Sequence, residues 1–338
     1  MNLETAAKTI SLEKAAETLA KPTTSRSFSF GNGILYDMCS SPSTDLSNPV
    51  HLADMIWLIG RAYAASPERR TYGYVREDGK LKKNSDNKRM PLFPAKKEND
   101  GKGVYFISIA ENMTKHPEFD NLLNIVNDLK GSTYKFDNSD CDVASLSDGI
   151  YAVHLYNQLI RNASEEFDGL NASDDPDAIK AKKAGARCKN QISFCSKFLH
   201  FCCPGIVFII DQYSLEGGKR VIPGREPSYV PKFENDSKKL VPLESVNPKG
   251  NYNDVLKGNY NDVLEKVADK LKAKALDSNL FENDTTSDEE EKIRSYVEHC
   301  TRAYCVAKYL NETKCQHDLT KMPRLIDDLF LRVKKNKE

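Results

Sequence analysis

The chain has 338 residues, in which 49 Lys and Arg balance 49 Asp and Glu, so its formal net charge is zero. Proteins that work along DNA usually carry a basic excess, because contacts to phosphates supply much of their affinity. The even balance counts against a general nucleic-acid binder. The chain holds no run of 18 apolar residues, which excludes an ordinary transmembrane helix.

The first 47 residues are predicted to form an arm of one small amphipathic helix and a loop. Residues 3–20 carry Ala, Leu and Ile at helical spacing, and residues 21–47 are rich in Ser, Thr, Pro and Gly. No basic region leads into an apolar one, so we expect no secretory signal. Nine irregularly spaced cysteines are typical of reduced thiols, and we therefore expect a cytoplasmic protein.

A strong helical pattern begins at Asn48, because Asn is a favoured N-cap and a following proline suits the first turn. We expect Trp57 in the core instead of on an exposed base-stacking face. Three arginines near the predicted helix end either bind a phosphate or carboxylate or cap the helix. They are Arg61, Arg69 and Arg70.

Residues 71–115 are predicted as a β-excursion, with strands at 71–76 and 104–109. Within it, residues 80–102 hold eight Lys and Arg against three Asp and Glu. This segment is either a solvated loop or a site for an anionic partner. The candidate binding residues are Lys82, Lys83, Lys88 and Arg89.

The remaining predicted elements are nearly all helices, so we expect a mainly α fold with a small inserted β-hairpin. The helical body spans 48–70 and 116–335. Its predicted helices cover 116–131, 143–161, 193–203, a segment from 212, 261–276, 290–310 and 322–335. We predict a long irregular connection over 215–250. The tandem repeat KGNYNDVL, at 249–256 and 257–264, is expected in a surface loop.

Two acidic runs are predicted between helices, over 162–178 and 282–291. Exposed acidic surfaces of this kind can imitate nucleic acid or occupy a basic partner. The candidate partner-binding residues are Glu165, Glu166, Asp168, Asp288, Glu289 and Glu290.

The most apolar stretch, ISFCSKFLHFCCPGIVFIIDQYS at 192–214, contains a charged pair, Lys197 and Asp211. Ser193 is expected to cap a helix that Pro204 ends, and an extended segment then returns Asp211 towards Lys197. One hypothesis is structural: Lys197 reaches the surface and Asp211 caps the next helix. The other is catalytic, because a desolvated lysine can act as an amine nucleophile beside a carboxylate.

The pattern S-F-x-S-K-F-L-x-F, then a proline and an apolar run ending in Asp, resembles the Lys…Asp region of the helix-hairpin-helix DNA glycosylases. The likeness is to bacterial proteins of the 8-oxoguanine glycosylase fold. It covers 190–214, and 318–332 resembles their closing Arg…Asp helix. The resemblance implies that Lys197 forms a Schiff base with deoxyribose and that Asp211 is its acid–base partner. The family's glycine-rich hairpin does not precede Lys197, where CKNQISFC stands.

The cysteine clusters show no CxxC pair, so we predict core packing and no metal or other cofactor. Two function classes remain open. The preferred one is a binding or inhibitory protein on a glycosylase-like scaffold, such as a phage inhibitor of a bacterial DNA-targeting defence complex. Its partner would be a protein complex, with DNA and a second copy as further partners. The alternative is a DNA glycosylase or lyase that uses Lys197 and Asp211.

Overall fold

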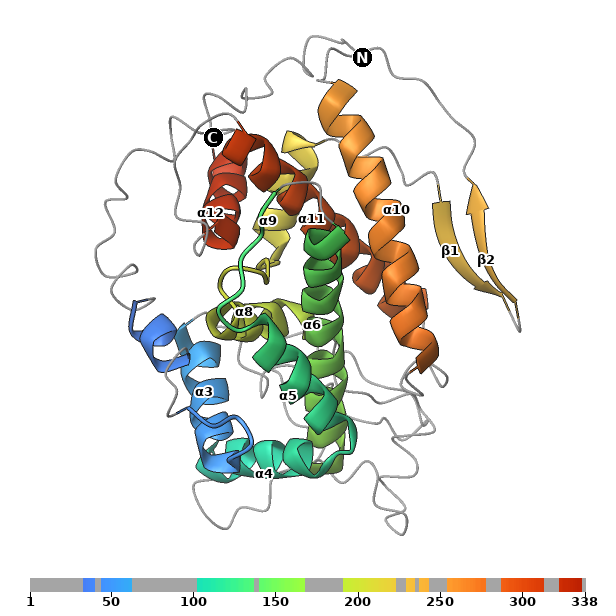
Figure 1. Ribbon diagram of the computed structural model, residues 1–338. Coiled ribbons are helices and arrows are strands. Elements are labelled where there is room, and N and C mark those ends of the chain that lie inside the picture. Colours follow the sequence, from blue (N-terminus) through green and yellow to red (C-terminus); the bar gives the residue numbers. More distant parts are fainter. Residues whose placement is uncertain are drawn as a thin grey trace, which may run out of the picture.

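The computed structural model describes residues 33–39, 44–62, 102–136, 140–167, 191–222, 229–234, 237–242, 254–277, 287–312 and 322–335. Within these ranges the protein is mainly α-helical, as predicted (Figure 1). The elements are a short helix at 33–39, α3 (Pro49–Ala62), α4 (Lys102–Lys115), α5 (Glu118–Leu129), α6 (Asp140–Phe167), α8 (Ile192–Cys202), α9 (Gln212–Val221), β1 (Tyr229–Glu234), β2 (Ser237–Pro242), α10 (Asp254–Asp277), α11 (Ser287–Glu312) and α12 (Met322–Lys335). The predicted N-terminal helix at 3–20 lies outside these ranges.

α6 is the central helix of the described body. It packs against α4, α5, α8, α10 and α11, and Figure 1 shows it running lengthwise through the middle of the molecule. Residues 149–157 are all buried, so apolar side chains surround this part of the helix. A helix that is apolar on all sides is expected at the centre of a large core. Lys274 of α10 forms a 2.7 Å ion pair with Asp148 of α6.

α3 begins as the sequence predicts, because the Asn48 side chain accepts a hydrogen bond from the Val50 N–H at 2.9 Å. Its core face includes Leu52, which is buried, but Trp57 is 44% exposed. Trp57 lies about 140° around the helix from Leu52, at roughly 100° per residue. The prediction that Trp57 belongs to the core is therefore wrong.

α4 replaces the strand that we predicted at 104–109. The buried residues Phe106, Ile109, Ala110 and Met113 follow the i, i+3, i+4, i+7 spacing of one helix face. Residues 104–110 alone are rich in aromatic and β-branched residues, which favour a strand. The helical spacing becomes visible only when Met113 is included. The predicted strand at 71–76 and the basic residues up to 101 lie outside the described residues.

A two-stranded antiparallel hairpin is present, but it lies in the segment that we predicted as an irregular connection over 215–250. β1 pairs with β2 from Tyr229 opposite Pro242 to Glu234 opposite Ser237. The first part of that segment is also regular, since α9 extends to Val221. The predicted connection is therefore wrong for these residues.

The second copy of the tandem repeat, 257–264, lies within α10, which begins at Asp254. The predicted surface loop is wrong for residues 257–260, whereas residues 261–264 are helical, as the predicted helix at 261–276 has them. Its Tyr260 is buried, and the Arg302 guanidinium of α11 lies 5.4 Å from the centre of the Tyr260 ring. The repeat thus supplies core contacts between α10 and α11.

Residues 206–210 form the extended segment expected before Asp211, without a strand partner in the described residues, and they are buried. Buried backbone groups need hydrogen-bond partners. Here side chains from α8, α11 and the turn before α6 supply them: Tyr134 to Ile206 O at 2.7 Å, His200 to Val207 O at 2.8 Å, Tyr296 to Phe208 O at 3.2 Å, His299 to Ile209 O at 2.9 Å, and Ser196 to Ile210 N–H at 3.2 Å.

Candidate active site

The turn between α8 and α9 brings Lys197 and Asp211 together, as predicted. The Lys197 Nζ lies 3.9 Å from the Asp211 Oδ2. α8 ends at Cys202, and Gly205 then passes so close to the Ser132 carbonyl that a β-carbon would overlap it. This close passage lets residues 206–210 return the chain through the core to Asp211.

Asp211 uses its two carboxylate oxygens for different contacts. Its Oδ1 accepts hydrogen bonds from the Tyr213 N–H at 2.9 Å and the Ser214 N–H at 2.8 Å, which caps α9. The Ser214 hydroxyl accepts a hydrogen bond from the Asp211 N–H at 2.9 Å, completing a capping box. The predicted cap is therefore confirmed, and it leaves Oδ2 directed towards Lys197.

Lys197 is enclosed within the protein. Its side chain is 7% exposed, whereas that of Asp211 is 27% exposed. The hypothesis that Lys197 reaches the surface is therefore wrong. Ser193 does not cap α8, because Gln191 occupies that position. The Ser193 hydroxyl instead accepts a hydrogen bond from the Lys197 ammonium at 2.9 Å.

α12 adds a third carboxylate to this site. Asp327 is 3% exposed, and burial raises the pKa of its side chain to about 7, against the lowering effect of Arg324. The Arg324 guanidinium lies 3.2 Å from the Asp327 Oδ2. Asp211 raises the Asp327 pKa further and Lys197 lowers it, which places all three groups in one electrostatic cluster. The Asp327 Oδ1 has no hydrogen-bond partner among the described residues.

Close packing of α9 on α12 holds this cluster together. Gly217 lies against the Phe330 backbone, where a β-carbon would overlap the Phe330 carbonyl. Only glycine permits the two helix backbones to approach to this degree. Asp211 at the start of α9 and Asp327 on α12 therefore belong to one rigid arrangement.

The two histidines beside the site have structural positions. His200 and His299 each hydrogen-bond a backbone carbonyl of the 206–210 segment. Burial lowers the pKa of His200 to about 3 and that of His299 to about 4. Both rings are therefore neutral at pH 7 and are not suited to carry a proton in a reaction at that pH.

The structure places few of the other predicted binding residues. Arg61 lies in the last turn of α3. Glu165 and Glu166 are helical, because α6 extends to Phe167, beyond its predicted end. Helix α11 starts at Ser287, three residues before the predicted helix at 290–310, so three further acidic residues lie in its first turn. They are Asp288, Glu289 and Glu290. The remaining predicted residues lie outside the described ranges: Arg69, Arg70, Lys82, Lys83, Lys88, Arg89 and Asp168.

Sequence reasoning missed two residues of this site, Ser193 as a partner of Lys197 and Asp327 as a buried acid. Ser193 precedes Lys197 by four residues, which is one helical turn, so its contact could have been predicted. Asp327 follows Arg324 in an amphipathic helix, where an acidic residue is expected on the surface. Its burial depends on the tertiary contact between α9 and α12.

The described cysteines confirm the prediction of core packing. Six of the seven described cysteines are buried free thiols, and Cys141 is exposed. The six are Cys39, Cys195, Cys202, Cys203, Cys300 and Cys305. Cys188 and Cys315 lie outside the described residues. Within the described parts, no three side chains of the metal-binding types come together. None of the described helices combines the length and hydropathy needed to cross a membrane.

Comparison of the chain with family models, with curated proteins and with solved structures found no match.

Proposed function

We propose that the protein is a DNA glycosylase or lyase in which Lys197 is the amine nucleophile and Asp211 is its carboxylate partner. The proposal is carried by the 3.9 Å approach of the Lys197 Nζ to the Asp211 Oδ2, at a lysine that is 7% exposed. The resemblance of residues 190–214 to the helix-hairpin-helix glycosylases supports the same two roles.

In the proposed reaction, the neutral amine of Lys197 attacks C1′ of a deoxyribose, and the bond from C1′ to the base or hydroxyl breaks. The attached nitrogen then loses a proton, and the C1′–O4′ bond breaks as O4′ takes up a proton, which opens the sugar ring and gives the iminium form of a Schiff base. The Asp211 carboxylate, close to Nζ, stabilises the positive charge that develops on the sugar. The capping hydrogen bonds to Oδ1 keep Asp211 in this orientation throughout.

Asp327 is suited to accept the proton that Lys197 must lose before it attacks. A pKa of about 7 lets a carboxyl group exchange a proton near neutral pH, whereas an ordinary aspartate is already fully ionised there. Its Oδ1 has no partner among the described residues and is available for this proton. Arg324 holds the other oxygen.

The first test is borohydride trapping of the full chain on duplexes that carry 8-oxoguanine, uracil or an abasic site. We expect a covalent protein–DNA adduct that Lys197→Ala abolishes. Asp211→Asn should reduce the trapping rate at least tenfold, and Asp327→Asn should remove the increase in rate through pH 7. Lys219→Ala is the matched control, because Lys219 is an exposed lysine on α9.

The control should trap as the unchanged protein does. Circular dichroism of each variant separates loss of chemistry from loss of folding. A folded protein that forms no adduct on any of the three duplexes, or an adduct that persists in Lys197→Ala, contradicts the proposal.

A second function, binding to a protein partner, is supported by the exposed apolar residues of α3. Trp57 is 44% exposed and Val50 is 53% exposed. They are seven residues apart and therefore lie on one side of the helix. An exposed tryptophan of this kind is a frequent anchor of protein interfaces. We propose that this side of α3 is the contact if the chain inhibits a bacterial defence complex.

The test is phage plating on bacteria that carry a DNA-targeting defence system, with and without the chain. We expect the chain to raise plating at least tenfold and Trp57→Ser to remove most of this rise, whereas Lys197→Ala leaves it unchanged. Plating that does not respond to the chain on any such host contradicts this second proposal.

A further inference from the structure

A cavity of about 240 Å³ lies between the short helix at 33–39, the loop at 44–47, α5 and the end of α8. Ser47 and Asn127 line it and are exposed, so the cavity opens to the solvent. None of its lining residues belongs to the Lys197 site. The cavity is therefore a second place at which the protein can hold a small molecule.

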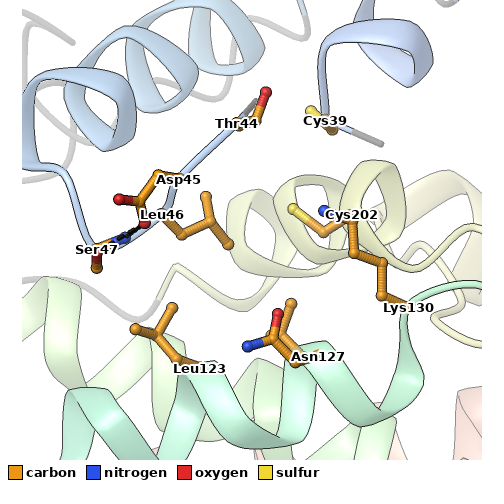
Figure 2. A pocket seen from close by; sticks show the side chains of 10 residues that line it. Cys39, Thr44, Asp45, Leu46, Ser47, Leu123, Asn127, Lys130 and Cys202 are labelled. Carbon is orange, nitrogen blue, oxygen red and sulfur yellow. Dashed lines mark hydrogen bonds between the residues drawn. The ribbon is translucent and has the colours of Figure 1, made fainter. Parts of the chain in front are cut away.

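Lys130 supplies a positive charge at this cavity. It is the C-cap residue of α5 and is half-buried. Figure 2 shows its side chain extending along one side of the cavity towards Cys202 and away from the last turn of α5. Among the described residues its ammonium forms no ion pair and no hydrogen bond. Because partial burial reduces the screening by water, an anion in the cavity interacts more strongly with this ammonium than it would at the open surface.

Asn127 supplies a neutral donor beside this charge. It precedes Lys130 by three residues, so the two side chains lie on neighbouring positions of one helix face. Figure 2 shows the Asn127 carboxamide on the side of α5 that faces the cavity. This carboxamide forms no hydrogen bond with the described residues. An ammonium and an amide N–H together match the two acceptor oxygens of a carboxylate.

The carboxylate of Asp45 also lines the cavity, but it does not neutralise Lys130. Its Oδ1 accepts hydrogen bonds from the Ser47 N–H at 2.9 Å and from the Ser47 hydroxyl at 2.6 Å. Figure 2 shows these bonds holding the carboxylate towards Ser47, on the side of the cavity opposite Lys130. Asp45 is exposed, so water screens its charge and the Lys130 ammonium stays available to a ligand.

The rest of the wall is mostly apolar. It consists of Leu46, Leu123 and Val126 together with the buried thiols of Cys39 and Cys202. An engineered cavity of about 150 Å³ in another protein binds benzene. A cavity of about 240 Å³ therefore has room for a body of that size together with a carboxylate group.

We propose that this cavity binds a small monocarboxylate whose apolar body is about the size of a benzene ring. The carboxylate pairs with the Lys130 ammonium and accepts a hydrogen bond from the Asn127 carboxamide. The apolar body lies against Leu46 and Leu123. A dicarboxylate or a sugar is disfavoured, because its additional polar groups would face the apolar wall without hydrogen-bond partners.

The test is isothermal titration calorimetry of the full chain with benzoate and, separately, with benzamide, which has nearly the same shape but no charge. We expect saturable one-to-one binding of benzoate and at least tenfold weaker binding of benzamide. Lys130→Met should weaken benzoate binding at least tenfold. Lys115→Met is the matched control and should bind as the unchanged protein does, because Lys115 is an exposed lysine in the last turn of α4.

Leu46→Trp tests the location of the bound ring, because the larger side chain should fill the cavity and abolish binding. Circular dichroism establishes that each variant is folded. The comparison of benzoate with benzamide uses the unmutated protein, so it does not depend on the folding of any variant. The proposal is overturned if benzoate shows no saturable binding at millimolar concentrations, if benzamide binds equally well, or if folded Lys130→Met or Leu46→Trp keeps the full affinity.

Discussion

At the scale of single residues, Asp142 shows how one buried carboxylate organises the backbone before α6. It accepts hydrogen bonds from the Lys135 N–H at 2.9 Å, the Phe136 N–H at 2.7 Å and the Tyr304 hydroxyl at 3.0 Å. Phe136 has a φ of 58°, a left-handed conformation that is costly for an aromatic residue. Asp142 therefore stabilises a turn that Phe136 alone would disfavour, and it connects this turn to α11.

We expect Asp142→Ala to lower the free energy of unfolding by about 3 kcal/mol, because it leaves buried donors of Phe136 and Tyr304 without an acceptor. Asp142→Asn keeps one acceptor oxygen and should lose less. Urea denaturation checks both values. Asp140→Ala is the matched control, since Asp140 lies in the same turn with an 83% exposed side chain. Equal losses for Asp140→Ala and Asp142→Ala would contradict this account.

At the scale of elements, local patterns predicted most helices but not the exceptions. Asn48 marked the start of α3. Gly131, with a φ of 79°, follows the end of α5, where glycine is the usual residue for this conformation. α4 was mistaken for a strand because its apolar period was judged over too few residues. The hairpin at 229–242 has few local signals, so composition alone indicated a loop.

The candidate site likewise has one part that local sequence predicts and one part that it does not. The Lys197–Asp211 approach followed from a helix, a proline and an apolar run that lie next to each other in the sequence. Asp327 is more than a hundred residues away, and its position depends on the contact of Gly217 with Phe330. A long-range approach of this kind has no signature in local composition, which is why the acid was missed.

At the scale of the whole molecule, buried titratable groups predict how stability depends on pH. Burial lowers the pKa of His154 to about 4, of His200 to about 3 and of His299 to about 4, whereas these side chains titrate near 6.5 when unfolded. Below pH 6.5 the unfolded state therefore binds more protons. Asp327 has the opposite effect on stability, because its raised pKa makes the folded state, and not the unfolded state, bind a proton between pH 7 and 4.

Three histidines outweigh one aspartate, so stability should fall as the pH decreases from 7 to 5, by roughly 3 kcal/mol. Urea midpoints measured at several pH values check the slope. His299→Gln keeps a donor for the Ile209 carbonyl. It should make the free energy of unfolding less dependent on pH, by the amount expected from about one fewer proton taken up on unfolding. A flat profile, or one that rises towards pH 5, would contradict the assignment of neutral buried rings.

The extended segment at 206–210 has a consequence for the unity of the fold. Its donors come from α8, α11 and the turn before α6, which are separated by up to a hundred and sixty-five residues, from Tyr134 to His299. A fragment that ends before α11 would leave the Phe208 and Ile209 carbonyls buried without donors. We therefore expect the helices around this segment to unfold together, and a fragment cut between them to be unstable.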